Sequence, residues 1–214
     1  MNAVSPDADP STMLFNVAII PPTDIAAEAI ALSREARSLG GRFELDTQFR
    51  HAHVTVYMAR FPSFNMDSTR IMLTEILSPL EKQTLVHSGY YLTPQSYYEI
   101  SYARTPELMK VHHRITAQLH ELRYSPGNPV VEDYFGPYRD EIKANVERWG
   151  YDLAEELYRP HLTLTRFPTE PEVATPQELL PTSERDLSFE MDKIGLFQAD
   201  NMGSAREPIS IIEI

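Results

Sequence analysis

Two short segments of this 214-residue sequence carry the same pattern of chemically capable side chains. They are HVTV at residues 53–56 and HLTL at residues 161–164, and each reads histidine, apolar, threonine, apolar. Alternate side chains of a strand point to the same face, so His53 shares a face with Thr55, and His161 with Thr163. The apolar members then point the other way, into a core. We call these two segments the cassettes.

Two imidazoles and two hydroxyls that converge on one cleft can act together on a phosphate group. An ordinary imidazole titrates near pH ~6.5, so one histidine can accept a proton while the other donates one. Such a pair suits in-line displacement at phosphorus, where each proton transfer contributes about 10²–10⁴-fold in rate. Threonine hydroxyls can hydrogen-bond the non-bridging oxygens as their charge grows. This chemistry needs no metal, cofactor or covalent intermediate.

The surroundings of the two cassettes also match. Both are followed by Arg-Phe-Pro, in HVTVYMARFP and in HLTLTRFP, and each comes after a predicted helix. A lone histidine in a strand is more often structural than catalytic. Two copies in matching settings reverse that expectation and favour a shared functional site.

The pair of cassettes resembles the double signature of the two-histidine (2H) phosphoesterase superfamily, which includes 2′,3′-cyclic phosphodiesterases and bacterial 2′-5′ RNA ligase-like proteins. RPHLTLTRF resembles the second motif of that family with its preceding proline, and FEMDKIGLFQAD resembles the strand that usually follows. The resemblance covers most of residues 13–214 in element order but is specific only around the motifs. It implies that His53 and His161 are the catalytic pair and that Thr55 and Thr163 bind phosphate.

The resemblance also implies an α+β fold that is bilobal and pseudo-two-fold, with antiparallel sheets lining a central cleft and helices on the outside. The hydrophobic periodicity and turn signals predict a compatible order of elements. Strands are expected at 13–20, 43–49, 52–61, 84–92, 96–103, 161–167, 187–197 and 207–214, and helices at 23–39, 67–82, 106–123 and 138–157.

We expect one domain over residues 13–214, preceded by a disordered lead over residues 1–12. Residues 125–137 read as a loop, and residues 168–181 as a proline-rich connection. The acidic, tyrosine-rich segment at about 125–150 has no counterpart that we can match in the family. It leaves the identity of the substrate open.

The composition limits the kinds of molecule that the protein can bind. The formal net charge of −12 argues against long duplex nucleic acid, which requires a basic face, but allows a small nucleotide or a short RNA end. The chain contains no cysteine, which excludes disulfides and a cysteine nucleophile and fits a cytoplasmic location. No apolar run reaches the ~18 residues of a membrane span, and the N-terminal stretch is not a secretory signal. We expect a monomer without a membrane partner.

Other residues near the cassettes have competing interpretations. His51 and His53 form HAH, which can be half of a metal site, although no carboxylate stands nearby at ligand spacing. Tyr57 and Thr165 continue the cleft faces if the strands are regular, so they are possible substrate contacts. Tyr57 can equally close the edge of the core. Even-numbered Arg60 and Arg166 then point away from the cleft.

The sequence therefore predicts a metal-independent phosphodiesterase that acts on 2′,3′-cyclic phosphates or on 2′-5′ or cyclic oligonucleotide linkages. The main alternative is a noncatalytic module that binds a nucleotide or phosphate in the same cleft. A carbohydrate or lipid phosphoesterase of the same fold and a metal hydrolase centred on His51 and His53 are further alternatives. The sequence does not indicate which histidine acts as the base.

Overall fold

The computed structural model describes residues 11–124, 139–168, 180–200 and 203–214. The predicted loop at 125–137 and most of the connection at 168–181 lie outside these residues, as do residues 1–10 of the predicted lead. Thr12, which the sequence pattern places in the lead, is instead the first residue of strand β1 (Thr12–Ile19).

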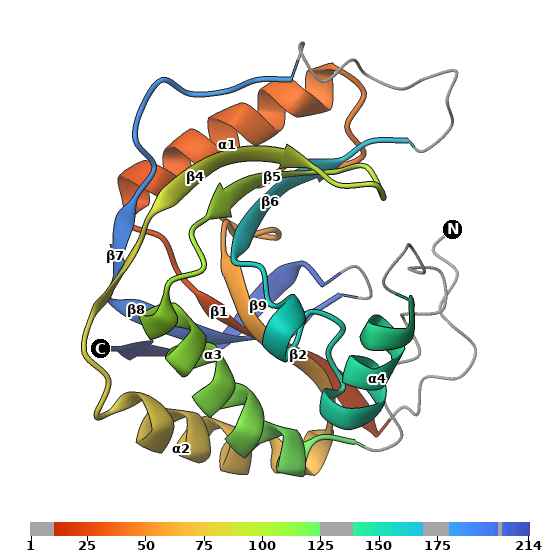
Figure 1. Ribbon diagram of the computed structural model, residues 1–214, viewed down its shortest axis with the longest axis vertical. Helices are drawn as coiled ribbons and strands as arrows, with labels where there is room; N and C mark the ends of the chain where they lie inside the picture. The colour runs from red at the N-terminus through yellow and green to blue at the C-terminus, as the bar shows by residue number, and fades with distance from the viewer. Residues whose placement is uncertain (1–10, 125–138, 169–179, 201–202) are drawn as a thin grey trace.

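Two antiparallel sheets form the two halves of the molecule (Figure 1). One has the strand order β2-β1-β8-β9 and the other has the order β4-β5-β6, while β3 and β7 form a separate pair. The first cassette therefore lies on an edge strand of one sheet, and the second on an edge strand of the other. The bounds are β2 (Val54–Pro62), β3 (Gln83–Leu85), β4 (His87–Leu92), β5 (Tyr97–Tyr102), β6 (His161–Arg166), β7 (Phe189–Met191), β8 (Lys193–Ala199) and β9 (Ala205–Glu213).

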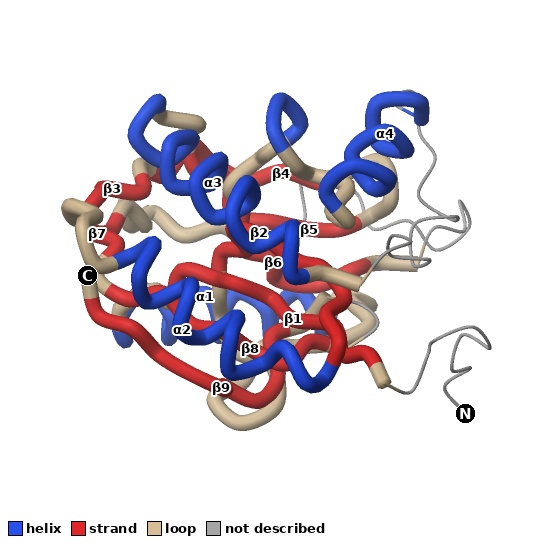
Figure 2. The backbone as a smooth tube through the Cα atoms, turned by 90° about the horizontal axis from the view of Figure 1, so that it is seen from below, coloured by secondary structure: helices blue, strands red, loops and turns tan. Residues whose placement is uncertain are grey.

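The helices cover the outer faces of the sheets. Helix α1 packs against β6 of the second sheet, while α3 packs against β2 of the first and lies beside α2 (Figures 1 and 2). Each sheet is thus covered by a helix that follows a strand of the other sheet, which ties the two halves together. The bounds are α1 (Thr23–Ser38), α2 (Met66–Leu77), α3 (Pro106–Leu119) and α4 (Arg139–Trp149), with short 3₁₀ turns η1 (Ser63–Asn65), η2 (His120–Leu122) and η4 (Glu155–Leu157).

The predicted α+β class and antiparallel sheets are confirmed. Local signals placed several elements well, for example the start of α3, where the Thr105 hydroxyl accepts a hydrogen bond from the backbone N–H of Leu108 and Pro106 is the first helical residue. The apolar spacing of α1 is also observed, because Ile25, Ala29 and Leu32 are all buried.

The predicted strand at 43–49 is wrong, because this segment is a loop. The Asp46 carboxylate accepts hydrogen bonds from the backbone N–H groups of Gln48 and Phe49, at 2.6 and 2.5 Å. An aspartate that bonds the backbone just after it favours a turn over an extended strand. The loop runs along the cleft instead of joining a sheet.

The predicted helix at 138–157 ends early, at Trp149. Gly150 follows with a φ of +74°, a conformation that glycine adopts without steric cost. The chain then turns back through η4 toward the second cassette.

Both cassette strands contain an irregularity at the same place. In the pairing of β1 with β2, Ala18 lies opposite Thr55 and Val17 lies opposite Tyr57, so Val56 is an extra residue. In the pairing of β5 with β6, Glu99 lies opposite Thr163 and Tyr98 lies opposite Thr165, so Leu164 is the extra residue. The bulge falls on the fourth residue of each cassette, and it reverses which side chains face the cleft beyond that point.

Candidate active site

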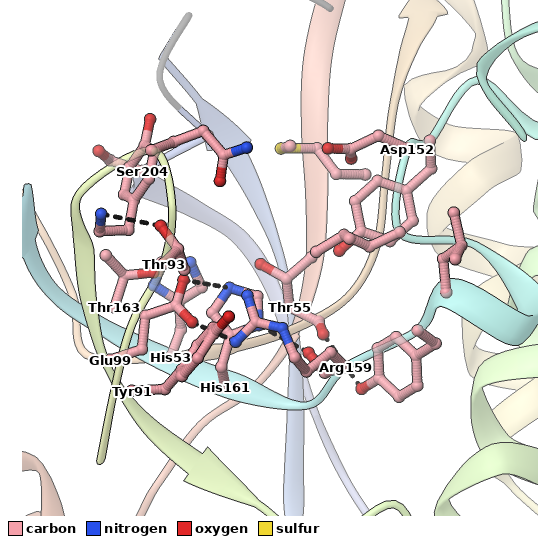
Figure 3. Close-up of a pocket in the computed structure, with 18 of the residues that line it drawn as sticks. His53, Thr55, Tyr91, Thr93, Glu99, Asp152, Arg159, His161, Thr163 and Ser204 are labelled. Atoms are coloured by element: carbon pink, nitrogen blue, oxygen red, sulfur yellow. Dashed lines mark hydrogen bonds and ion pairs between the residues drawn. The ribbon is translucent and has the colours of Figure 1, made fainter. Parts of the chain in front are cut away.

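A cleft of about 710 Å³ lies between the two sheets, and both cassettes open onto it (Figure 3). Its lining includes His53, which immediately precedes β2, Thr55 from β2, and His161 and Thr163 from β6. The four residues that the sequence singled out are thus brought together in one cavity. The remaining walls come from the 43–51 loop, the β4–β5 hairpin, residues 203–204 and the segment from α4 to η4.

The two histidines are oriented in the same way. The Nδ1 atom of His53 lies 2.7 Å from the carbonyl oxygen of His51, and Nδ1 of His161 lies 2.6 Å from the carbonyl oxygen of Arg159. A carbonyl only accepts, so each Nδ1 carries a proton and donates it to the backbone two residues earlier. Each ring therefore has its Nε2 atom left for other chemistry.

Asn16 of β1 lies beside the first cassette. Its Nδ2 atom lies 3.0 Å from the Thr55 hydroxyl oxygen, 3.1 Å from the Gly203 carbonyl oxygen and 3.2 Å from His53 Nε2. The side chain of Asn16 is fully buried. One amide thus holds both polar members of the first cassette and fixes them against residue 203.

Glu99 of β5 lies beside the second cassette. One of its carboxylate oxygens is 3.5 Å from His161 Nε2, and the other is paired with the Arg159 guanidinium. Glu99 is only 3% exposed, so these partners offset the energetic cost of burying its carboxylate. The Arg159 guanidinium also lies over the ring of Tyr91, 5.1 Å from its centroid. Figure 3 shows these groups clustered around His161.

Burial sets the protonation of His53. Desolvation in the cleft wall lowers the pKa of His53 from 6.5 to about 4, and the neighbouring charge of His161 acts in the same direction. His53 is therefore neutral at physiological pH, with Nδ1 protonated and the lone pair on Nε2. This is the state that a general base requires.

Another carboxyl group, that of Asp152, reaches the cleft from the turn between α4 and η4. Burial raises the pKa of Asp152, while its own backbone N–H and that of Leu153 oppose this effect. The turn is held by Asn145 of α4, whose Nδ2 donates to the carbonyl oxygens of Asp152 and Ala154 at 3.1 and 2.6 Å. The described part of the 125–150 segment, which we could not match to the family, thus contributes Ile142 to the lining of the cleft and holds the turn that carries Asp152.

Tyr57 and Thr165 do not continue the cleft faces, which corrects the sequence prediction. Both are fully buried, and neither lines the cleft. The Tyr57 hydroxyl donates to the Trp149 carbonyl oxygen at 2.6 Å, and the Thr165 hydroxyl donates to the Phe43 carbonyl oxygen at 2.6 Å. The cause is the bulge in each cassette, which turns the following residue into the core and places Met58, not Tyr57, in the cleft wall.

His51 lines the cleft, with its ring 5.9 Å from that of Phe197. Among the residues that the structure describes, no group of three or more histidine, aspartate or glutamate side chains is placed to hold a metal ion. Arg60 and Arg166 are absent from the described lining of the cleft. The Arg166 guanidinium stacks on Tyr97 and donates to the Gln95 carbonyl oxygen.

Sequence reasoning missed Asn16, Glu99 and Asp152. Asn16 is the one polar residue in the apolar run MLFNVAII, and Glu99 is the one charged residue in SYYEISYA. An isolated polar or charged residue in an otherwise buried strand requires a partner, and that was an available signal. Asp152 had no comparable signal, because the acidic stretch around it resembles a solvated surface.

Comparison with solved structures identifies the fold that carries this site. No family model matches this chain, and no curated protein matches it. The apo crystal structure of E. coli LigT aligns with a TM-score of 0.59 and 16% identity, over 95% of this chain and 98% of LigT. A structure described as a phosphoesterase aligns with a TM-score of 0.60 and 14% identity, over 94% and 98% of the two chains.

TT0787 of Thermus thermophilus gives a similar result, with a TM-score of 0.60, 16% identity and coverage of 94% of this chain and 97% of that chain. At these identities the likeness concerns the fold. The chain thus has the LigT-like phosphoesterase fold, as the resemblance of the cassettes implied. In the described part of the chain, no helix has both the length and the apolar character needed to cross a membrane.

Proposed function

We propose that this protein is a metal-independent phosphodiesterase that acts on 2′,3′-cyclic phosphates or on 2′-5′ or cyclic oligonucleotide linkages. His53 and His161 exchange protons with the attacking and leaving oxygens, and Thr55 and Thr163 hydrogen-bond the non-bridging oxygens of the phosphate. The reaction requires no covalent intermediate.

One observation carries this proposal. Two imidazoles at the edge strands of two different sheets line one cleft, and the Nδ1 atom of each is engaged by a backbone carbonyl, so Nε2 is the atom through which each ring can exchange a proton. The two rings thus combine a fixed orientation with a place in the wall of a large cavity, which a histidine buried in the core lacks. Two proton carriers around one cavity suit displacement at phosphorus better than the binding of a phosphate alone.

The charge of the cleft favours a small ligand. Its described lining contains three arginines and three acidic residues, so it lacks the excess of positive charge that a long polyanion needs. A nucleotide with one phosphodiester can be held by local hydrogen bonds. LigT, which shares the fold, has been solved with phosphate, with 3′-AMP and with ATP, and small nucleotides are therefore the first ligands to test.

The test is turnover on a panel of nucleoside 2′,3′-cyclic phosphates, short RNAs with a cyclic phosphate end, 2′-5′-linked oligomers and duplex RNA, from pH 5 to 9. We expect hydrolysis of at least one small or single-stranded substrate and little cleavage of the duplex. Calorimetric titration with the same compounds separates the alternative. Binding without turnover by the intact protein would favour the noncatalytic module, and preferred cleavage of the duplex would contradict the proposed substrate class.

A further inference from the structure

The two cassettes have matching geometry but different partners. In each half of the molecule, the strand that pairs with the cassette strand places one side chain beside the Nε2 atom of the histidine. On β1 that side chain is the amide of Asn16, beside His53. On β5 it is the carboxylate of Glu99, beside His161. The carbonyl contact at Nδ1 and the bulge that follows the threonine are shared.

The orientation of the Asn16 amide is fixed by its surroundings. An amide oxygen in the place of Nδ2 would lie 3.1 Å from the Gly203 carbonyl oxygen, and two acceptors do not bond each other. The NH₂ group therefore faces Gly203, Thr55 and His53. A proton on His53 Nε2 would point at this NH₂ group, so the contact favours the neutral imidazole with its lone pair on Nε2.

The opposite holds for His161. Its Nδ1 already donates to the Arg159 carbonyl, and its Nε2 lies 3.5 Å from a Glu99 oxygen. A carboxylate can only accept, and this one is buried. A proton on Nε2 gives Glu99 a second cationic partner, while a lone pair there would face a negative charge. The contact favours the doubly protonated imidazole.

We propose that Asn16 and Glu99 assign different roles to the two histidines, with His53 as the general base and His161 as the general acid. Asn16 and Glu99 are the positioning residues that set the two protonation states. This assignment rests on the proposed function, and it adds the direction of proton transfer that the symmetric cassettes leave undefined.

With a cyclic phosphate, the two histidines act in a single displacement at phosphorus. Nε2 of His53 takes a proton from water as the water oxygen forms a bond to phosphorus. The bond from phosphorus to one ribose oxygen breaks, and that oxygen takes the proton from Nε2 of His161. Proton exchange with solvent then restores both rings. The product is a phosphate monoester, and no oxidant, reductant or further reactant is consumed.

Other charged groups act on the two rings and must be considered in any pH experiment. His161 is surrounded by Glu99, Arg159, Asp152 and His53. The groups that act on His53 are His51, His161 and Asp200. Among these contacts, the difference at Nε2 is that one ring meets a neutral amide and the other meets a carboxylate.

The first test needs no substrate. Long-range ¹⁵N–¹H NMR of the ligand-free protein at pH 6 reports the protonation of each ring nitrogen. We expect His53 to be protonated only at Nδ1 and His161 to be protonated at both nitrogens. Neutral His161 beside a doubly protonated His53 would overturn the assignment, and so would two rings in the same state.

The second test exchanges the partners. Glu99→Gln removes the carboxylate beside His161, and Asn16→Asp places one beside His53. With Glu99→Gln we expect kcat to fall at least about tenfold with little change in KM, since a general acid contributes about 10²–10⁴-fold, and the alkaline limb of the rate profile to move to lower pH. With Asn16→Asp we expect the acid limb to move to higher pH.

Glu190→Gln is the matched control, because Glu190 is a glutamate paired with Lys82 outside the cleft. It should leave both limbs of the pH profile in place. A purely structural role for Glu99 would lower the melting temperature without moving the alkaline limb, and that result would contradict the proposal. If the intact protein turns over no substrate, the proposed function fails, while the NMR measurement still decides the protonation states.

Discussion

The ring of His112 lies flat on the ring of Tyr158, with centroids 3.9 Å apart and an interplanar angle of 4°. His112 belongs to α3 and is fully buried. Its Nδ1 donates to the Val56 carbonyl at 2.8 Å, and its Nε2 accepts the backbone N–H of Glu155 at 2.9 Å. The Tyr158 hydroxyl donates to the Thr55 carbonyl. These contacts tie the approach to the second cassette to the strand of the first.

Replacement of His112 should therefore destabilise the protein. His112→Phe keeps an aromatic ring for the stack but leaves two buried backbone groups without partners, at a cost of about 2–5 kcal/mol. Urea unfolding measures the loss. His113→Phe is the control, because His113 is half exposed and its ion pair with the Glu155 carboxylate at 3.3 Å is worth at most about 1 kcal/mol. Equal losses in the two variants would contradict the role that we give to His112.

Stability should fall with acid over a defined range. Burial lowers the pKa of His112 from 6.5 to about 4, so the unfolded chain binds a proton that the folded protein resists. The contribution of His112 is complete above pH ~6.5 and is lost as the pH falls toward ~4, on the order of 3 kcal/mol, and His53, whose pKa is lowered in the same way, adds to the loss. Unfolding midpoints at a series of pH values from 4 to 7.5 measure it. A stability curve that stays flat over this range would show that His112 titrates normally.

Removal of either cassette histidine should abolish most activity without unfolding the protein. His53→Ala and His161→Ala each remove one proton carrier, worth about 10²–10⁴-fold. Because the two act as a unit, the double variant should be little slower than either single variant. Tyr57→Phe is the matched control, since Tyr57 lies on the same strand but in the core, and kcat should not change. Wild-type turnover in either alanine variant would refute the assignment.

The two threonines should differ in their effects. Thr55→Val removes a hydroxyl that accepts a hydrogen bond from Asn16, so it should lower both kcat and the melting temperature. Thr163→Val removes a hydroxyl that lines the cleft, and it should lower kcat by about 10²–10³-fold with little change in melting temperature. Steady-state kinetics and thermal unfolding separate these outcomes. Loss of stability with full specific activity in both variants would make the hydroxyls structural.

Activity should survive chelation. The proposed proton carriers are imidazoles and the proposed phosphate ligands are hydroxyls, and neither requires a cation. Turnover after treatment with EDTA, followed by addition of zinc or manganese, measures the dependence. Complete loss that is restored by one metal would favour the alternative site at His51 and His53.

The local sequence determined which face the cassette histidines occupy and where many of the helices and strands begin. The alternation of apolar and polar residues in HVTV and HLTL places both histidines on the face opposite the apolar residues, whatever the rest of the chain does. The proline and threonine at the start of α3 fix that helix end for the same local reason. Such features depend on neighbours in the chain, so sequence reasoning can find them.

Tertiary structure decided which groups complete the site. Asn16 and Glu99 reach the histidines because β1 pairs with β2 and β5 pairs with β6, and strand pairing joins residues that are far apart in the chain. The bulges that withdraw Tyr57 and Thr165 arise from the register between two strands, which one strand's pattern does not encode. The burial of His112 also depends on the tertiary structure, because its two ring nitrogens bond to segments that fold against α3. The sequence supplies two equal histidines, and their unequal neighbours come from the fold.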